Sequence, residues 1–349
     1  MERYERLTKV GEGSYGVVYR CRHRETGLIV AIKKFTESED DPAIKKIAMR
    51  EVRMLKQLKH PNLINLFEVF KRNRKIHLVF EYCERTVLDD LEKYPAGCPE
   101  PLIKKTIYQL IQGVNFCHKL NVLHRDIKPE NILISQDSVK LADFGFARTM
   151  NSNELYTDYV ATRWYRCPEL LVADVDYGTP VDIWAIGCVL AEMILGDAIW
   201  PGRSDIDQLY LIIKTMGNLI ERHAVYFHEN PYYRGLSIPS PDQIITLDVK
   251  FAEYSSATLD ILKKCFQMNP EKRASASELL THPYFQGVQL PIIDTQPQDN
   301  IFKRKTNNAL PMIPQTSTVN SPLMENKEKK NFIFSNLTNN VRGGYLPMI

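Results

Sequence analysis

No Cys-x-x-Cys pair occurs among the seven cysteines of this 349-residue chain. Their scattered positions exclude a zinc framework and a disulfide scaffold, and they are typical of a reducing compartment. Long apolar runs are missing too, because the strongest one, residues 183–191, is too short to cross a bilayer. The first residues are charged and do not resemble a signal peptide. We therefore expect a cytoplasmic protein that does not enter a membrane.

The excess of positive charge is small. The chain has 45 lysines and arginines against 42 aspartates and glutamates, which gives a formal net charge of +3. This balance argues against a dedicated nucleic-acid-binding protein. Short basic clusters at residues 303–305 and 327–330 leave nuclear entry open as a second location. The hydrophobic content of 44% is ordinary for a globular protein with a sizeable core.

The order of the expected elements divides the chain into unlike parts. Residues 4–10, 17–22 and 28–35 have strand-like patterns separated by glycine-containing turns. A helix is predicted next, with Asp41 as its N-cap, Pro42 in its first turn and an apolar face made by Ile44, Ile47, Ala48, Leu55 and Leu58. Strand-like runs return at residues 63–70 and 75–81. Beyond residue 84 helical patterns prevail, at residues 102–120, 181–195, 205–216 and 256–267.

These patterns predict an α+β protein in which a small β-rich lobe with one helix precedes a larger helical lobe. We place the small lobe at residues 1–83 and the large lobe at residues 84–286. Residues 287–349 are rich in Asn, Gln, Pro, Ser, Thr and Lys, so we expect a largely flexible tail there.

Residues 11–18 match the pattern G-x-G-x-x-G-x-V, with glycines at positions 11, 13 and 16. Glycines allow a backbone turn to approach phosphates without an intervening side chain. The same string also marks dinucleotide-binding turns, but those need a helix directly after the glycines. Because strand-like sequence lies on both sides here, we interpret the segment as a lid over phosphates.

A lysine in an apolar strand and a glutamate on the inward face of the next helix form a candidate ion pair. Lys33 follows Val-Ala-Ile, and taken alone it would be interpreted as an exposed lysine beside Lys34. Glu51, however, lies four residues after Ile47 and four before Leu55, on the apolar stripe of its helix. A buried carboxylate needs a cation, so we predict that Lys33 pairs with Glu51 and is aimed at the phosphates of a nucleotide.

The strongest chemical signal is His124-Arg-Asp-Ile-Lys-Pro-Glu-Asn131, followed by Asp143-Phe-Gly. Phosphoryl transfer needs a carboxylate near the attacking hydroxyl and oxygen ligands for Mg²⁺. We assign the first role to Asp126 and the second to Asn131 and Asp143, while Lys128 would neutralise charge on the transferred group. The alternative, a solvated loop of acids and bases, does not explain three motifs in this order.

In these motifs the chain resembles the eukaryotic protein kinase superfamily over residues 4–286. The resemblance continues through Cys167-Pro-Glu169, Asp182-Ile-Trp-Ala-Ile-Gly187 and Arg273. It implies a bilobal protein-kinase fold, with ATP and Mg²⁺ as cofactors and an ion pair between Glu169 and Arg273. Lys128 is typical of the serine/threonine branch, so protein substrates with Ser or Thr hydroxyls are expected. Cys167 stands where the family usually has alanine.

Finer features resemble the cyclin-dependent-kinase-like group. Residues 45–51 read Lys-Lys-Ile-Ala-Met-Arg-Glu, and residues 157–159 read Thr-Asp-Tyr, similar to the Thr-x-Tyr of mitogen-activated protein kinases. Residues 218–250 fall where this wider group carries an insert. In residues 45–51 two lysines replace the residues that cyclins contact, so we expect a monomer that is active without a cyclin.

The resemblance also implies roles for individual residues. Phe80 would guard a back pocket, the backbone at Glu81 and Cys83 would bind adenine, and Val18, Ala31 and Leu133 would sandwich its ring. The complete implied ATP-binding set is Val10, Gly11, Glu12, Gly13, Ser14, Tyr15, Gly16, Val17, Val18, Ala31, Lys33, Phe80, Glu81, Cys83 and Leu133. The catalytic set is Lys33, Glu51, Asp126 and Lys128, and the metal ligands are Asn131 and Asp143.

Regulation is expected in the segment that contains Thr157 and Tyr159. A phosphate adds about two negative charges and three acceptor oxygens. Arg50, Arg125 and Arg148 match the arginine cluster that receives a phosphate on Thr157, and Arg163 and Arg166 could receive one on Tyr159. The alternative is that these arginines pair with ordinary carboxylates. An upstream activating kinase would be a partner, and Arg166 implies a preference for proline after the phosphorylated residue.

Two other functions remain to be weighed. A catalytically silent pseudokinase scaffold usually lacks the strand lysine or a catalytic aspartate, but Lys33, Asp126, Asn131 and Asp143 are all present. A nucleic-acid-binding protein that uses its basic tail fits neither the charge balance nor the motifs. We therefore predict an active kinase.

Overall fold

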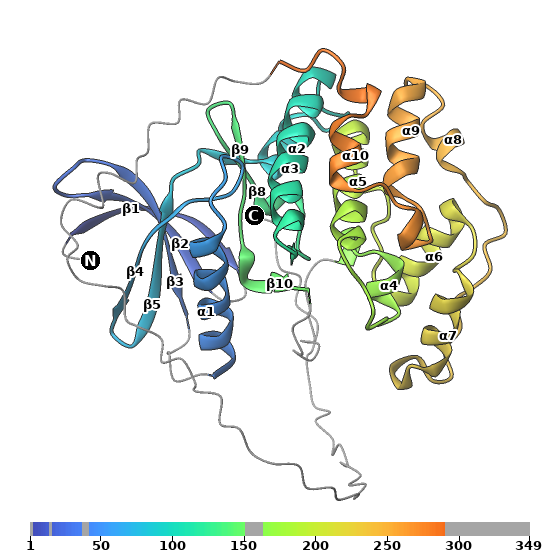
Figure 1. Ribbon diagram of the computed structural model, residues 1–349, viewed down its shortest axis with the longest axis horizontal. Helices are drawn as coiled ribbons and strands as arrows, with labels where there is room; N and C mark the ends of the chain where they lie inside the picture. Colours follow the sequence, from blue (N-terminus) through green and yellow to red (C-terminus); the bar gives the residue numbers. More distant parts are fainter. Residues whose placement is uncertain (1–2, 14–15, 37–41, 151–162, 290–349) are drawn as a thin grey trace, which may run out of the picture. The chain divides into compact units, whose positions relative to one another are not determined.

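A five-stranded antiparallel sheet, in the order β1-β2-β3-β5-β4, forms the first part of the chain (Figure 1). Its strands are β1 (Tyr4–Gly13), β2 (Gly16–His23), β3 (Ile29–Phe35), β4 (Leu66–Arg72) and β5 (Lys75–Glu81). Helix α1 (Pro42–Gln57) lies beside this sheet.

The structure is a computed structural model and describes residues 3–13, 16–36, 42–150 and 163–289, all within one compact unit, Met1–Thr306. The predicted positions Ser14, Tyr15, Asp41, Thr157 and Tyr159 lie outside the described residues, as does the chain from residue 290.

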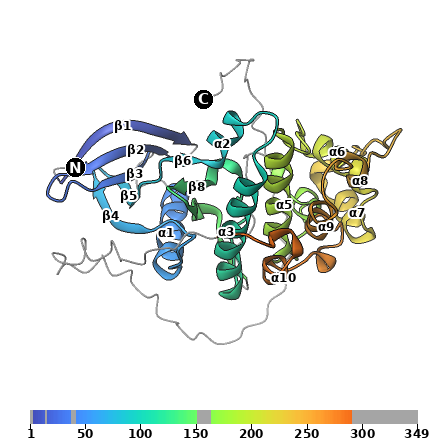
Figure 2. The same cartoon turned by 90° about the horizontal axis from the view of Figure 1, so that it is seen from above.

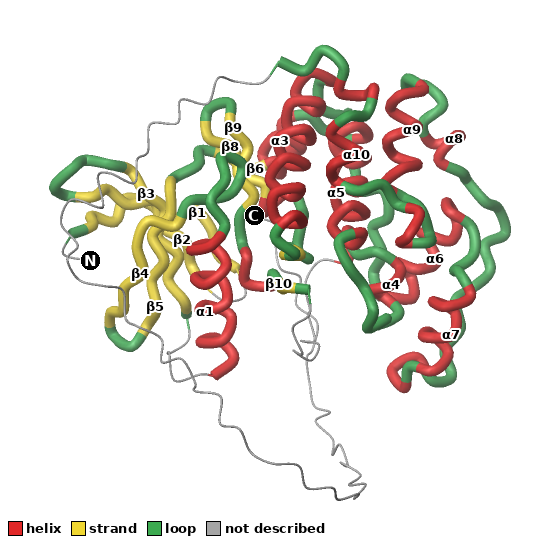
Figure 3. The backbone as a smooth tube through the Cα atoms, in the orientation of Figure 1, coloured by secondary structure: helices red, strands yellow, loops and turns green. Residues whose placement is uncertain are grey.

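The second part is mainly helical (Figure 3). Its helices are α2 (Val87–Lys93), α3 (Glu100–Lys119), α4 (Pro168–Leu171), α5 (Pro180–Leu195), α6 (Asp205–Met216), α7 (Glu221–Glu229), α8 (Leu247–Lys250), α9 (Ser256–Cys265) and α10 (Ala276–Leu280). Five short strands accompany them: β6 (Arg85–Thr86), β7 (Val122–Leu123), β8 (Ile132–Ser135), β9 (Ser138–Leu141) and β10 (Arg148–Thr149). They form a three-stranded sheet, β6-β8-β9, and the pair β10-β7. The view in Figure 2 places β8 between α1 and α3.

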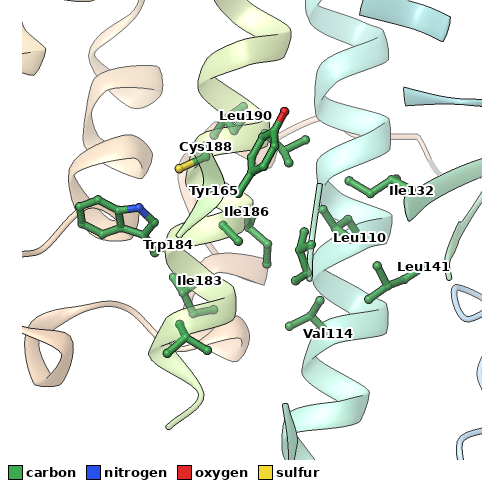
Figure 4. Packing of buried hydrophobic residues seen from close by; sticks show 14 of the residues in the cluster. Leu110, Val114, Ile132, Leu141, Tyr165, Ile183, Trp184, Ile186, Cys188 and Leu190 are labelled. Carbon is green, nitrogen blue, oxygen red and sulfur yellow. The ribbon is translucent and has the colours of Figure 1, made fainter. Parts of the chain in front are cut away.

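Helix α5 is the centre of the large lobe. Every residue from Val181 to Ile194 is buried, since the helix is apolar on all sides and other elements surround it. Figure 4 shows its side chains facing those of α3, while Ile132 of β8 and Leu141 of β9 lie on the other side of α3. On its other side Trp184 packs against Trp200 and Phe266, with ring centroids 5.2 Å and 5.1 Å away. Gly187 permits this packing, because a Cβ there would lie 2.7 Å from Cβ of Cys265.

The predicted α+β architecture with two unlike lobes is confirmed, but two details of the prediction were wrong. Strand β4 begins at Leu66, not at residue 63. The residues before it bond elsewhere, since Leu141 donates to the carbonyl of Asn62 and Ile64 donates to that of Leu141, both at 2.9 Å. The short strands β6–β10 were not predicted because two to four residues are too few to display a period of two. Among the described residues, no helix combines the length and apolar character needed to cross a membrane.

Candidate active site

A cavity of about 480 Å³ is lined by residues of both lobes. Thirteen residues that the sequence singled out for nucleotide, metal or catalytic roles lie on its wall: Val10, Gly11, Gly16, Val18, Ala31, Lys33, Glu51, Phe80, Glu81, Cys83, Asn131, Leu133 and Asp143. The small lobe contributes strands β1, β2, β3 and β5 and helix α1, and the large lobe contributes β6, α2, β8, the loop before β8 and the segment after β9. The cavity has the size and the mixed apolar and polar wall of a small-molecule site.

The glycine-rich segment does not contribute uniformly to this cavity. A Cβ on Gly11 would meet only an ordinary contact, 3.9 Å from Cβ of Val18, whereas a Cβ on Gly16 would lie 2.6 Å from the carbonyl oxygen of Lys34. Gly16 is therefore required by the close approach of β2 to β3. Val17 is absent from the cavity wall because successive side chains of a strand point to opposite faces. Glu12 is exposed, is also absent from the wall, and pairs with Lys9.

Sequence reasoning missed eight residues of the wall: Ile64, Tyr82, Glu84, Arg85, Thr86, Asp89, Glu130 and Ala142. One signal was available for two of them. Thr86 and Asp89 form a capping box at the start of α2, in which each side chain bonds to the other's backbone N–H. The spacing Thr-x-x-Asp before an apolar run is a sequence signature of a helix start. Glu130 and Ala142 are neighbours of Asn131 and Asp143 in their motifs, and Tyr82 lies between Glu81 and Cys83, so those motifs were the available signal. Ile64, Glu84 and Arg85 come from segments without a recognisable pattern.

Lys33 lies between two carboxylates. Its Nζ is 3.0 Å from Oε2 of Glu51 and 3.2 Å from Oδ1 of Asp143. Burial opposes the charge on Lys33, but Asp143 and Glu51 outweigh that effect and raise its pKa above the ordinary range. The lysine is therefore a fixed positive charge at the cavity wall.

The carboxylates of Glu51 and Asp143 differ in the direction of their pKa shifts. Burial raises the pKa of Glu51 to about 7, against the opposing attraction of Lys33, because its side chain is only 2% exposed. Burial also acts to raise the pKa of Asp143, but Lys33 outweighs it and holds that pKa below the ordinary value. Asp143 is thus ionised at neutral pH and faces the cavity as a carboxylate.

Asp126 is held from several sides in the loop before β8. Nδ2 of Asn131 donates both to Oδ2 and to the carbonyl of Asp126, each at 2.8 Å. Nζ of Lys128 lies 3.5 Å from Oδ2 of Asp126. The sequence predicted that these three residues act together, and the structure brings them together. A carboxylate and a lysine this close can accept a proton and balance negative charge on a neighbouring oxygen.

Asp182, on α5, fixes the backbone of this loop. Its Oδ2 accepts from the N–H of His124 and its Oδ1 from that of Arg125, at 2.9 and 2.8 Å. Burial acts to raise the pKa of Asp182, but hydrogen bonds from His118 and His124 outweigh it and lower the pKa. The loop needs this support because Arg125, at φ 68°, adopts a left-handed backbone conformation that is strained for residues other than glycine. Asp143, in the segment after β9, adopts a similar conformation at φ 60°.

Asn131 and Asp143 have the donor atoms that a hard cation prefers. The amide nitrogen of Asn131 is engaged by Asp126, which leaves its Oδ1 as the atom available to a metal. Lys33 and the N–H of Gly145 both bond to Oδ1 of Asp143, and Oδ2 remains available among the described residues. The described residues contain no cluster of three or more His, Cys, Asp or Glu that could enclose a metal by itself. A divalent cation that takes its remaining ligands from phosphate and water fits this set.

The three arginines expected to receive a phosphate on Thr157 lie around one short segment. Nη1 of Arg50 is 3.4 Å from the carbonyl of Gly145, and Nε of Arg125 donates to the carbonyl of Phe146 at 2.8 Å. Arg125 also donates to the hydroxyl of Tyr177, and the guanidinium of Arg148 lies 5.9 Å from the centre of that ring. The cluster therefore exists, although Thr157 itself is outside the described residues.

Arg163 and Arg166 share one carboxylate. Nε of Arg163 donates to Oδ1 of Asp205 at 2.9 Å, and Nη1 of Arg166 lies 4.0 Å from the same atom. These contacts correspond to the alternative in which the arginines pair with ordinary carboxylates. Arg166 also lines a small cavity of about 20 Å³ together with Asp126 and Tyr165, so it lies next to the catalytic loop.

The expected pair of Glu169 and Arg273 is present and buried, with Nη2 of the arginine 2.8 Å from Oε2 of the glutamate. Cys167, two residues earlier, is fully buried, and burial raises the pKa of its thiol. The thiol is therefore chemically unreactive, and the side chain packs where the family that this sequence resembles usually has alanine.

Comparison with known proteins supplies an independent assignment. The protein kinase domain family matches residues 4–285. Cyclin-dependent kinase-like 1 of Caenorhabditis elegans is 59% identical over 315 residues, which cover 90% of this chain and 89% of that protein. Cyclin-dependent kinase-like 4 of Mus musculus is 54% identical over 317 residues, covering 90% of this chain and 93% of that protein. Cyclin-dependent kinase-like 4 of Homo sapiens is 57% identical over 290 residues, covering 83% and 76%.

Proposed function

Because this chain belongs to the protein kinase family, as a cyclin-dependent-kinase-like serine/threonine kinase, we propose that it phosphorylates Ser or Thr residues followed by proline. We further propose that phosphates on Thr157 and Tyr159 control this activity. The observation that carries the proposal is that Lys33 and its two carboxylates share the wall of one cavity with Asn131, whose side chain in turn bonds to Asp126, the partner of Lys128.

The small lobe would bind the nucleotide. Val18, Ala31 and Leu133 line the cavity with apolar surface suited to a flat ring, and the backbone at Glu81 and Cys83 would bond the adenine edge. Lys33, whose charge Asp143 and Glu51 stabilise, would hold the α- and β-phosphates. Glu51 would act through Lys33, by fixing the position of its ammonium group.

Asp126 would orient the substrate hydroxyl and accept its proton. As that proton moves to Asp126, the hydroxyl oxygen forms a bond to the γ-phosphorus of ATP, and the bond from that phosphorus to the bridging oxygen breaks to leave ADP. Lys128, 3.5 Å from Asp126, would balance the negative charge on the transferred group. Asn131 would keep the carboxylate of Asp126 in place through its 2.8 Å hydrogen bond.

Asn131 and Asp143 would hold Mg²⁺ through Oδ1 and Oδ2 respectively. When bound, the ion would supply positive charge that offsets the negative charge of the phosphates. The low pKa of Asp143 favours this role, because the side chain is a carboxylate over the whole neutral range.

Phosphorylation would act on the arginines. A phosphate on Thr157 would accept charge-assisted hydrogen bonds from Arg50, Arg125 and Arg148. These arginines already contact the carbonyl of Gly145, the carbonyl of Phe146 and the ring of Tyr177, respectively. A phosphate on Tyr159 would compete with Asp205 for Arg163 and Arg166. The added phosphate has more charge than a carboxylate, so it would draw both arginines toward the segment that carries it. An upstream kinase would supply these phosphates.

The preference for proline would depend on Arg166. This residue lines the same small cavity as Asp126, and the residue after the phosphorylated one would pass beside it. Its guanidinium would satisfy a backbone carbonyl next to a pocket that admits a proline ring.

We further propose that the protein acts as a monomer in the cytoplasm, without a cyclin, and that its basic clusters allow entry to the nucleus.

The test is transfer of labelled phosphate from Mg²⁺-ATP to a library of serine–proline and threonine–proline peptides. The protein would be assayed before and after phosphorylation of Thr157 and Tyr159, beside Lys33→Arg and Asp126→Asn. Transfer that disappears in both variants and favours proline supports the proposal. A fully phosphorylated protein that binds ATP but transfers nothing would support the scaffold alternative instead.

A further inference from the structure

The chain itself contains dipeptides of the kind that the proposed enzyme would phosphorylate. Two of them, Thr179–Pro180 and Ser240–Pro241, lie among the described residues, and a third, Ser321–Pro322, lies outside them. A hydroxyl group in a folded protein becomes a substrate only if the backbone around it can leave its place and enter another active site. The structures around Thr179 and Ser240 differ sharply in this respect.

Thr179–Pro180 is built into the start of α5, and both residues are half-buried. The carbonyl of Thr179 accepts a hydrogen bond from the N–H of Asp182 at 3.2 Å. The carbonyl of Pro180 accepts one from Nη1 of Arg273 at 3.1 Å. Removal of this dipeptide from its place would break both bonds at the start of the central helix of the large lobe. Thr179 is therefore inaccessible to a kinase in the folded protein.

Ser240–Pro241 lies in the segment without helix or strand that follows α7 and ends at α8, and Ser240 is exposed. Residues 237–244, which we call the Ser240 loop, form no hydrogen bond with any described residue. The bonds on either side are made by the N–H groups of Leu236 and Ile245, each 2.9 Å from its acceptor. The Ser240 loop can thus change its backbone conformation without losing a hydrogen bond.

Both ends of the Ser240 loop are fixed to the large lobe. Tyr233 is 4% exposed and donates its hydroxyl to the carbonyl of Leu171 at 2.7 Å, and Leu247 is 3% exposed. Within the loop, Ile238 is half-buried against the core. Residues 237–244 measure at most about 28 Å when fully extended, so the middle of the loop can move outward by at most about 14 Å while its ends stay in place. Ser240 can therefore enter a neighbouring active site without unfolding of the large lobe.

The active site that Ser240 enters is not that of its own chain. Figure 1 and Figure 2 both place α7 and α8, which flank the segment that contains the loop, at the end of the large lobe away from the sheet. Asp126, in contrast, is bonded to Asn131 on the wall of the cavity between the two lobes. In both views α5 lies between these two places. A loop held at both ends cannot pass around this helix, so the phosphate must come from a second copy of the protein.

We propose that one copy of this kinase phosphorylates Ser240 of another copy. The inference rests on the proposed function, because it takes Ser240–Pro241 as a substrate of the proline-directed enzyme. The hydroxyl of Ser240 gives its proton to Asp126 of the second copy while its oxygen bonds to the γ-phosphorus of ATP, and the bond from that phosphorus to the bridging oxygen breaks to leave ADP. Pro241 then lies beside Arg166 of the second copy, which lines the same small cavity as Asp126. An encounter of two monomers is sufficient for this reaction.

The experiment uses the full chain as enzyme and as acceptor. The enzyme is the unaltered protein in the form that is active on serine–proline peptides. The acceptor is the Asp126→Asn chain, whose phosphate comes from another molecule. Quantitative mass spectrometry measures the phosphate at each position over time with Mg²⁺-ATP. We expect phosphate to appear on Ser240 and not on Thr179, at an initial rate that rises with the concentration of the acceptor.

Two further changes in the acceptor test the role of the proline. Pro241→Ala should lower the initial rate at Ser240 about tenfold, because the second copy then loses the residue that its Arg166 helps to recognise. Ser237→Ala is the matched control, since Ser237 is exposed in the same loop and is not followed by proline. This control should leave the rate at Ser240 unchanged. Lys33→Met is a second acceptor should Asp126→Asn not fold, with the same expected phosphorylation of Ser240.

The outcomes separate this inference from the proposed function. An enzyme that phosphorylates serine–proline peptides but leaves Ser240 of the folded acceptor unmodified would overturn the inference alone. An enzyme that phosphorylates neither would overturn both. Equal initial rates at Ser240 and Thr179 would also contradict the inference, because the free backbone of the Ser240 loop would then give no advantage.

Discussion

Arg273 and Glu169 form a buried ion pair across 104 residues of sequence, and every hydrogen bond of the arginine goes to a group in the core of the large lobe. Nη2 of Arg273 donates to Oε2 of Glu169 at 2.8 Å, Nη1 donates to Oε1 and to the carbonyl of Pro180, and Nε donates to the carbonyl of Gln267. The guanidinium also lies 4.9 Å from the ring centre of Trp184. The pair therefore joins α4 to the start of α5 and to the chain that follows α9.

Replacing Arg273 by methionine should destabilise the protein strongly. The exposed fractions of the two side chains are 0% and 1%, so the variant would leave Glu169 charged and unpaired in the core. Breaking such a pair lowers the free energy of unfolding by about 3–5 kcal/mol. Denaturation in urea measures this loss, and Glu169→Gln together with Arg273→Met should cost less than the sum of the single changes. A loss below about 1 kcal/mol in the single variant would contradict the structural role of the pair.

Lys33→Met should reduce kcat by about a hundredfold or more, because it removes a fixed charge from the wall of the nucleotide cavity. Steady-state transfer of labelled phosphate measures the effect. Lys34→Met is the matched control, since Lys34 is the next residue on β3 and is not part of the cavity wall. Equal losses in the two variants would show that the strand, and not the position of Lys33, is responsible.

Asp126→Asn should reduce the rate of the transfer step by about 10²–10⁴-fold and leave nucleotide affinity nearly unchanged. The change preserves the shape of the side chain and its contact with Asn131, but it removes the group that accepts a proton. Single-turnover kinetics with a peptide separates this step from binding. Asp137→Asn, an exposed position, serves as the control. Transfer within tenfold of the unaltered protein would exclude Asp126 as the base.

Glu192→Gln should change the pH dependence of stability. Burial raises the pKa of Glu192 to about 7 from an ordinary value of 4.5, against the opposing hydrogen bond that its Oε2 accepts from the hydroxyl of Tyr165 at 2.7 Å. The folded protein therefore binds this proton more tightly than the unfolded chain does, and the contribution to stability falls as the pH rises from 4.5 to 7.

Glutamine keeps an oxygen acceptor for Tyr165 and has no charge, so the variant should be more stable than the unaltered protein by about 1–3 kcal/mol at pH 8. At pH 4.5 the two should differ little. Urea denaturation at both values measures the difference, with the exposed Glu253→Gln as the control. The quantity to compare is the difference in free energy of unfolding between Glu192→Gln and the unaltered protein. A smaller gain in stability at pH 8 than at pH 4.5 would refute this prediction.

Arg166→Ala should lower the preference for proline by about tenfold, the effect of losing roughly one hydrogen bond to a charged group. The measurement is the ratio of kcat/KM for paired peptides that have proline or alanine after the phosphorylated serine. Arg234→Ala, an exposed position after α7, is the control. An unchanged ratio would mean that another group recognises the proline.

Local sequence patterns were sufficient for the main helices and strands of both lobes. Strand β5 and helix α6 have the predicted limits, because each has a clear period and a clear end. The start of β4 was not predictable, since residues 63–65 are as strand-like as those that follow. They leave the sheet only because Asn62 and Ile64 bond to Leu141, which is distant in the chain.

For the candidate site, the sequence by itself determined which side chains have the necessary chemistry, because Lys33, Glu51, Asp126, Asn131 and Asp143 occur in motifs with specific spacing. Only the tertiary structure decided how they are combined. It placed Lys33 within reach of Asp143 as well as Glu51, assigned Gly16 to strand packing, and paired Arg163 and Arg166 with Asp205. Periodicity and spacing report on neighbours within one element, whereas these contacts join residues from separate elements. The distances and the burial of these groups arise only when the whole chain packs. The pKa shifts that depend on burial therefore arise at the same stage.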